Sequence, residues 1–298
     1  MDGSETAGLE LRLREHVHAL AVEIGERHAF RAGSLQAASG YVEEKLRRAG
    51  LDVRSQEFAV GDATVRNLEA TKPGLNPGLP GILIGAHYDS VPGCAGANDN
   101  ATGVAALIEI AASLGDAAPR RSLMFGAFVN EEPPFFRSAA MGSRVAARSL
   151  RETRAPLDGM ISLETIGYYD TRPGSQRYPF PFGALYPDRG EFVGFVANLR
   201  SLRFVRKCIQ SFRHCSSFPA QWVAAPGWIP GLGWSDHWAF WREGYAGVMV
   251  TDTAPFRYPW YHTAGDTPEK LMFRDFARVV AGLQQMTRRL CEVDSDGT

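Results

Sequence analysis

The sequence lacks the features of several large protein classes. It has only four cysteines in 298 residues (Cys94, Cys208, Cys215 and Cys291). They match no CxxC spacing, so we expect free thiols rather than a disulfide framework or a thiolate metal site. No apolar run reaches the roughly 18–20 residues that a membrane-spanning helix needs. The first residues show no basic segment followed by an apolar core, so a cytoplasmic protein without a membrane partner is expected.

A charge excess of one sign is also missing. Lys and Arg number 32 and Asp and Glu 33, which gives a formal net charge of −1. This balance argues against nucleic acid or an anionic lipid surface as a partner. The composition, 45% hydrophobic and 22% charged, is that of a globular chain. Because no internal repeat or long Pro-, Gly- or Ser-rich linker divides the chain, we expect a single domain over residues 1–298.

Hydrophobic periodicity predicts alternating strands and helices. Helices are expected over residues 9–26, 35–49, 102–114, 142–150, 202–214 and 268–291. Strands are expected over residues 53–60, 64–70, 81–86, 122–129, 159–163, 192–197 and 246–250. Such alternation is typical of an α/β fold with a mainly parallel sheet covered by helices on both faces. Ligands of these folds bind beyond the carboxyl ends of the strands.

Residues 168–234 interrupt this alternation. The segment is rich in aromatic residues, proline and glycine, as in Tyr178-Pro-Phe-Pro-Phe182 and around Trp222, Trp228 and Trp234. Two interpretations stay open, packing beneath long loops and an apolar substrate pocket or lid.

Acidic residues and histidines stand where the buried strands end. They are His87 and Asp89 after the strand at 81–86, Asp99 in the next loop, Glu131 and Glu132 after 122–129, Glu164 after 159–163, and His262 beyond 246–250. The carboxyl ends of parallel strands share one edge of a sheet, so these side chains are expected to converge. Two histidines with several carboxylates and no thiolate suit Zn²⁺, with Mn²⁺ or Co²⁺ as substitutes. The set suffices for two metals if one carboxylate bridges them, and Glu131 beside a ligand could then act as general base.

Five segments in this order resemble the co-catalytic, di-zinc aminopeptidase family of α/β zinc exopeptidases, which is related to the glutaminyl cyclases. They are His87-Tyr-Asp-Ser90, Gly96-Ala-Asn-Asp-Asn-Ala-Thr-Gly103, Asn130-Glu-Glu132, Ser235-Asp-His237 and Tyr261-His-Thr-Ala-Gly-Asp-Thr267. The resemblance spans about residues 35–290 and implies a three-layer sandwich with a mixed, mostly parallel sheet. It also implies removal of N-terminal residues from peptides.

The resemblance assigns roles by position. Asp99 would bridge two zinc ions, with His87 and Glu164 completing one site and Glu132 and His262 the other. Glu131 would be the general base, and Tyr261 would donate a hydrogen bond to the oxyanion. Asp89 would orient the His87 imidazole, Asp236 would have a structural or substrate-orienting role, and His237 would not bind zinc.

Two departures from the family pattern leave the substrate open. A segment with two prolines and two phenylalanines, Pro133-Pro-Phe-Phe136, follows the glutamate pair, and Glu164 stands where the aminopeptidases often have aspartate. The leading hypothesis is hydrolysis of peptides with a free N-terminus. The alternatives are a glutaminyl cyclase, an amidohydrolase acting on a small amide, and a binding protein without catalysis.

Overall fold

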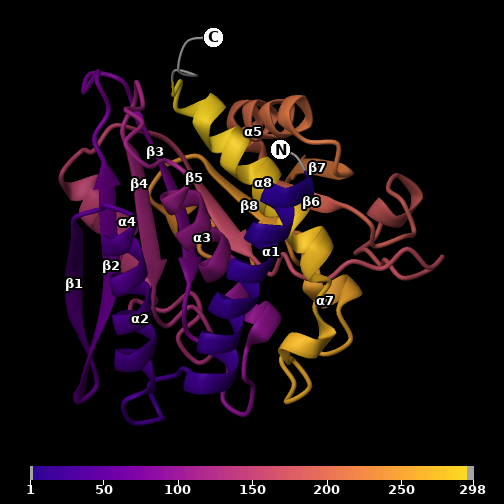
Figure 1. Cartoon of the computed structure of the whole chain (residues 1–298), viewed down its shortest axis with the longest axis horizontal. Helices are drawn as coiled ribbons and strands as arrows, with labels where there is room; N and C mark the ends of the chain where they lie inside the picture. The colour runs from indigo at the N-terminus through magenta and orange to yellow at the C-terminus, as the bar shows by residue number, and fades with distance from the viewer. Residues whose placement is uncertain (1–2, 294–298) are drawn as a thin grey trace.

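The computed structural model describes residues 3–293 and is built on one eight-stranded sheet (Figure 1). In chain order the strands are β1 (Val53–Val60), β2 (Ala63–Lys72), β3 (Gly81–His87), β4 (Leu123–Phe128), β5 (Leu157–Glu164), β6 (Val193–Asn198), β7 (Ala220–Ala225) and β8 (Gly247–Thr251). Their order across the sheet is β1-β2-β4-β3-β5-β8-β6-β7. The central strands β4, β3, β5 and β8 run parallel to one another. Strands β1, β2 and β4 pair in antiparallel fashion, and β6 is antiparallel to β8 but parallel to β7.

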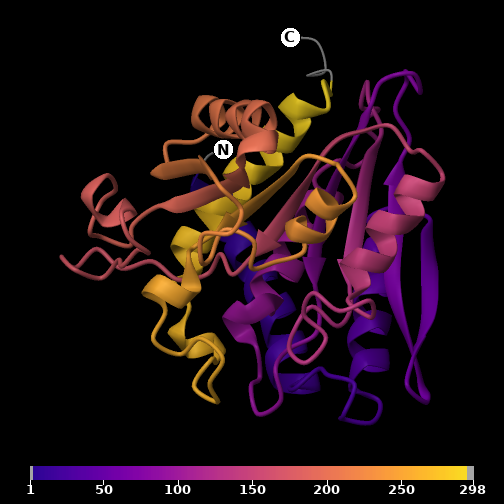
Figure 2. The same ribbon diagram turned by 180° about the vertical axis from the view of Figure 1, so that it is seen from behind.

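Helices cover both faces of this sheet, as Figures 1 and 2 show from opposite sides. The main helices are α1 (Gly3–His18), α2 (Ser34–Arg48), α3 (Gly103–Ala112), α4 (Gly142–Glu152), α5 (Leu202–Cys215), α6 (His237–Arg242), α7 (Ala254–Arg257) and α8 (Phe273–Leu290). Helices α1, α2, α3, α5 and α8 pack together on one face, and α4 packs with α6 on the other. The prediction of a three-layer α/β sandwich with a mixed, mostly parallel sheet is therefore confirmed.

Local sequence explains the regular elements. Strand β3 is buried along its whole length, as expected of a continuous apolar run in the middle of a sheet covered on both sides. The β1–β2 hairpin turns at Gly61 and Asp62, between the strands predicted over residues 53–60 and 64–70, and Gly61 has φ +59°. Helix α2, predicted over residues 35–49, ends before Gly50, whose φ of +79° terminates the helix.

Several short elements differ from the sequence prediction. Strand β7 and the short helices α6 and α7 were not predicted, because runs of four to six residues carry too little periodicity to be recognised. Helix α8 begins at Phe273 rather than at residue 268, since residues 268–270 form a separate turn that starts with proline. Within residues 3–293, no helix combines the length and apolar character needed to cross a bilayer. All four cysteines are free, as expected.

Candidate metal centre and active site

The carboxyl ends of the parallel strands bring the predicted site residues together at the lower edge of the sheet in Figure 1. His87 and Glu164 are the last residues of β3 and β5, and Glu131 and Glu132 lie just beyond β4. Asp99 lies in the segment before α3. His262 lies in the loop after α7.

Two triads of potential ligands share Asp99. In the first, Nε2 of His87 lies 3.4 Å from Oδ1 of Asp99 and 3.3 Å from Oε2 of Glu164. In the second, Nε2 of His262 lies 3.2 Å from Oδ2 of Asp99 and 3.2 Å from Oε2 of Glu132. Each oxygen of Asp99 thus faces a different histidine, an arrangement that a bridging carboxylate requires.

The electrostatics of the cluster favour cations. Burial raises the pKa of Glu132 to about 8, with a further contribution from Asp99. Burial likewise raises the pKa of Glu131 and of Glu164. Burial alone would lower the pKa of His262, but its contacts with Asp99 and Glu132 raise it to about 10. The metal-free site therefore retains protons that bound metal would displace.

Buried polar atoms without hydrogen-bond partners also indicate that the cluster binds cations. Nε2 of His87, Oδ1 of Asp99 and Oε1 of Glu132 are buried and have no hydrogen-bond partner within residues 3–293. Buried polar atoms are almost always paired in native proteins, so a cluster of unpaired nitrogen and carboxylate oxygen atoms fits a site that binds a cation. Imidazole nitrogen and carboxylate oxygen are suitable ligands for zinc. The residues present therefore fit a pair of divalent metal ions.

Glu131 belongs to neither of the triads that share Asp99, although it forms a third possible ligand group with His87 and Glu132. Its Oε2 is 4.0 Å from Nε2 of His87, and its side chain is buried. The two oxygens of Asp89 accept the backbone N–H groups of Glu131 and Glu132, each at 3.1 Å. The expected contact of Asp89 with Nδ1 of His87 is present but long, at 3.5 Å. The Asp89 carboxylate thus positions the backbone of Glu131 and Glu132, and it also faces the imidazole of His87.

The segment that carries Asp99 is held by side chains from other parts of the chain. The backbone N–H groups of Asn98 and Asp99 donate to the buried carboxylate of Asp266 at 2.8 and 3.1 Å. Asn100 donates from its amide nitrogen to the carbonyl of Leu163, the residue before Glu164. Gly96 has φ +63°, and a Cβ there would lie 2.4 Å from the carbonyl oxygen of Asp99. These contacts fix Asp99 against β5.

Arg27 also positions this region, although the sequence analysis did not identify it. Its guanidinium is fully buried and donates to five backbone carbonyls, those of Leu20, Gly25, Tyr88, Ala95 and Gly96. It therefore connects the end of the first helix to the loop between His87 and Asp99. A single arginine outside any motif carries no sequence signal of such a role.

The remaining predicted residues lie around the metal cluster. Tyr261 stacks on His262 with ring centroids 3.9 Å apart, and burial raises the pKa of its hydroxyl, which therefore keeps its proton. Asp236 is buried, and burial raises its pKa to about 7. Among residues 3–293, His237 belongs to none of the groups of possible metal ligands. Its Nε2 lies 2.7 Å from the carbonyl oxygen of Leu232.

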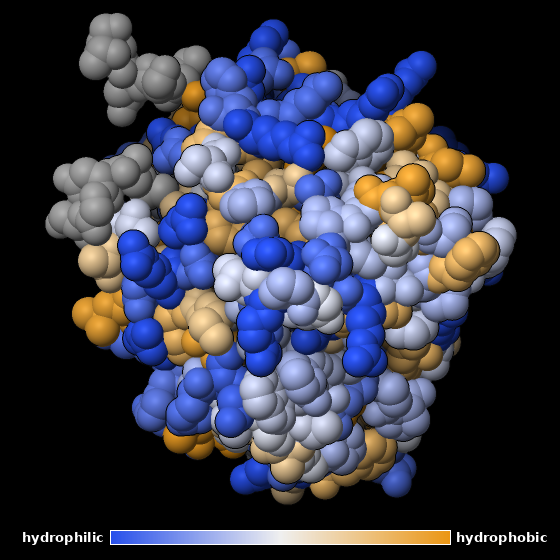
Figure 3. Space-filling view, turned by 90° about the vertical axis from the view of Figure 1, so that its right-hand side faces the viewer, coloured by the Kyte–Doolittle hydropathy of each residue, from blue (hydrophilic) through white to orange (hydrophobic). Residues whose placement is uncertain are grey.

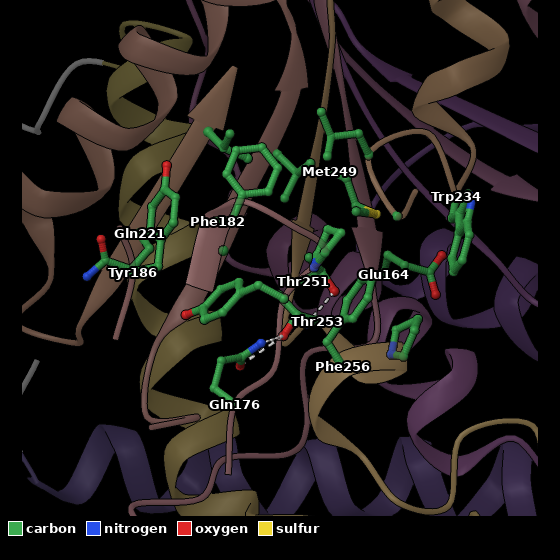
Figure 4. Close-up of a pocket in the computed structure, with 18 of the residues that line it drawn as sticks. Glu164, Gln176, Phe182, Tyr186, Gln221, Trp234, Met249, Thr251, Thr253 and Phe256 are labelled. Carbon is green, nitrogen blue, oxygen red and sulfur yellow. Dashed lines mark hydrogen bonds between the residues drawn. The ribbon is translucent and has the colours of Figure 1, made fainter. Parts of the chain in front are cut away.

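An apolar pocket opens beside Glu164 and Tyr261 (Figure 4). It extends over β6, β7 and β8, and many of its lining residues come from the aromatic segment 168–234. They include Tyr178, Phe182, Tyr186, Phe192, Trp222, Leu232 and Trp234, together with Met249 and Phe256. Gln176 is one of its few polar residues, and its amide is held by Thr253 and Arg257. The pocket therefore offers an apolar surface next to the metal cluster.

The surrounding surface is mixed. On the face that Figure 3 presents, hydrophobic side chains form separate groups among hydrophilic ones. No continuous apolar sheet of side chains covers the face that Figure 3 presents.

Comparisons with known proteins give a family and a fold. The sequence matches the family described as peptidase family M28 over residues 67–286. It is 38% identical over 281 residues to the uncharacterized protein YfbL of Escherichia coli K12, covering 91% of this chain and 85% of that protein. The zinc aminopeptidase BSAP of Bacillus subtilis has a similar fold (TM-score 0.76, 14% identity, 97% and 96% of the two chains). So does the glutaminyl cyclase of Macrostomum lignano (TM-score 0.70, 19% identity, 99% and 95%).

Proposed function

The chain belongs to peptidase family M28, and from that premise we propose that it is a zinc-dependent aminopeptidase acting on peptides with an apolar first residue. The observation that carries the proposal is the pair of ligand triads sharing Asp99 beside the apolar pocket. The family match supports a hydrolase of the peptidase class. Metal identity, restriction to the N-terminus and the preferred side chain belong to the proposal.

The two triads define the proposed metal ligands. His87, Asp99 and Glu164 would hold one zinc ion, and Asp99, Glu132 and His262 the other. Zinc bound there would lower the pKa of a water molecule and polarise the carbonyl of the scissile bond. Mn²⁺ or Co²⁺ could replace zinc, because the same oxygen and nitrogen ligands suit these ions.

The chain's own residues then move the protons. Glu131 accepts a proton as water attacks the carbonyl carbon, and it returns that proton to the amine nitrogen as the C–N bond breaks. Tyr261 donates its hydroxyl proton in a hydrogen bond to the oxyanion that forms on the former carbonyl. The products are a free amino acid and a peptide shortened by one residue.

Specificity for a free N-terminus follows from charge and shape. The α-ammonium group of a peptide is attracted to the carboxylates of Glu164, which lines the pocket, and of Glu131, which lies with Glu164 around Nε2 of His87. The first side chain then enters the apolar pocket between Trp234 and Phe182 (Figure 4). An N-acetylated peptide has no such charge and would be a poor substrate.

A panel of peptides tests the proposal. The zinc-loaded protein is incubated with matched free and N-acetylated peptides whose first residue is varied, including glutamine, and the products are identified by mass spectrometry. Stepwise loss of apolar first residues from free peptides only is expected. Loss of ammonia alone from glutamine peptides would identify a cyclase. Hydrolysis of small amides but of no peptide would identify an amidohydrolase. The Glu131→Gln variant, purified in the same way, controls for contaminating peptidases.

A further inference from the structure

Two aromatic rings stack on each other in loops that adjoin the segments carrying the proposed metal ligands. Phe30 and Phe135 stack with ring centroids 6.0 Å apart and an interplanar angle of 16°. Phe30 is 65% exposed, and Phe135 is partly exposed. We call this pair the aromatic platform. Burying an exposed aromatic ring against a ligand is favourable, so the platform is a binding surface if a ligand passes over it.

Both rings belong to segments tied directly to the metal cluster. The N–H of Phe135 donates to the carbonyl of Glu132 at 2.9 Å, so Phe135 lies one turn beyond a proposed ligand. The Phe30 loop is held by two hydrogen bonds between Arg27 and Ser90, at 2.8 and 3.1 Å. Ser90 follows His87 by three residues. The platform therefore stands at the same edge of the sheet as the ligands.

The Phe135 segment is anchored at its far end as well. Nη2 of Arg137 donates to the carbonyl of Gly233 at 3.0 Å, and its guanidinium lies over the ring of Trp238 at 5.0 Å. Pro133 and Pro134 restrict the backbone before Phe135. A surface that is already ordered loses little conformational entropy on binding.

The sheet order places the platform opposite the apolar pocket. The pocket lies over β5, β8, β6 and β7, whereas Phe135 follows β4 and the Phe30 loop is tied to the segment after β3. In the order of the strands, β3, which carries His87, lies between β4 and the strands beneath the pocket. A peptide whose first side chain occupies the pocket would run across the metal cluster toward the platform.

We propose that the aromatic platform binds an apolar side chain in the residues that follow the scissile bond. This inference rests on the proposed aminopeptidase function and assigns a role to the Pro133–Phe136 segment, which that function leaves unexplained. It also predicts that the substrate is a peptide of at least two residues rather than a small amide.

Three tripeptides with the same preferred first residue X test the inference: X-Gly-Gly, X-Phe-Gly and X-Gly-Phe. For the zinc-loaded protein, kcat/KM is expected to be about fivefold to tenfold higher for at least one phenylalanine peptide than for X-Gly-Gly. Phe30→Ala and Phe135→Ala should each reduce this ratio toward one. A ratio is unaffected by a general loss of active protein, because that loss lowers both rates equally.

Leu75→Ala is the matched control, since Leu75 is an exposed apolar residue (69%) in the loop before β3, at the opposite edge of the sheet. It should leave the ratio unchanged. Equal kcat/KM for all three peptides, or an unchanged ratio in both phenylalanine variants, would overturn the platform while leaving the aminopeptidase proposal intact. Absence of hydrolysis of all three peptides would overturn both.

Discussion

Glu131→Gln separates catalysis from metal binding in this site. Glutamine has nearly the shape of glutamate and keeps the backbone N–H that Asp89 holds at 3.1 Å. Its amide cannot accept a proton from water. Because Glu131 is outside both triads that share Asp99, the substitution leaves every proposed ligand in place. The variant is therefore expected to bind two zinc ions and to lose turnover.

The magnitude follows from the role assigned to Glu131. A positioned general base contributes about 10²- to 10⁴-fold to rate, so kcat should fall by about that factor, equivalent to about 3–5 kcal/mol in the activation free energy. Burial raises the pKa of Glu131 above its usual range, so a neutral amide fits the metal-free site at least as well as the carboxylate. The metal-free variant should therefore unfold at the same temperature as the metal-free wild type, or higher.

Three measurements on purified protein test this reasoning. Steady-state kinetics with a free peptide give kcat, elemental analysis gives zinc per chain, and calorimetry with and without chelator gives the unfolding temperatures. Asp275→Asn is a suitable control because Asp275 is a partly exposed residue on α8 that is paired only with Arg278 among the described ion pairs. A Glu131→Gln variant that retains kcat within tenfold, at full zinc content, would refute the general-base assignment.

Three further predictions concern metal, positioning and pH. Removing zinc with a chelator should lower the unfolding temperature by about 10 °C in calorimetry, since a ligand at a thousand times its Kd stabilises by about 4 kcal/mol, and re-addition of zinc should restore it. Arg27→Met should destabilise the protein by about 3–5 kcal/mol in urea unfolding, because five buried carbonyls lose their donor, whereas the exposed Arg48→Met should change little. Burial lowers the pKa of His237 from 6.5 to about 4. Between these two pH values the His237 imidazole is protonated in the unfolded chain but stays neutral in the folded chain. In chelator, stability relative to His237→Gln should therefore fall by about 3 kcal/mol between pH 7 and pH 4, and a pH-independent difference would contradict a buried neutral imidazole.

Much of the central sheet could be predicted because its strands have strong local signals. Strand β3 is a continuous apolar run between glycines, and β5 and β8 are nearly as apolar. Histidine or acidic residues stand at or soon after the ends of these strands. Because the carboxyl ends of parallel strands share one edge of the sheet, these residues are expected to lie together. His87 and Glu164 are predictable in this way, since each is the last residue of its strand.

Contacts between distant segments could not be predicted in the same way. Arg27 acts through carbonyl groups, and any residue supplies a carbonyl, so the sequences of its partners contain no trace of the interaction. The stack of Phe30 on Phe135 joins residues more than 100 positions apart that belong to no common motif. Their partners are determined by how loops 25–33 and 130–141 pack, which is a property of the folded chain.

The same distinction explains why the chemistry of this protein is easier to infer than its substrate. Metal ligands must have particular atoms at particular strand ends, so histidine and carboxylate positions are recognisable one by one. The pocket and the aromatic platform need only apolar surface of suitable shape, which many side chains supply. Their placement over different strands becomes evident only when the sheet order β4-β3-β5-β8-β6-β7 is known. Substrate preference is therefore the property for which the three-dimensional arrangement adds most, and the tripeptide ratio measures it directly.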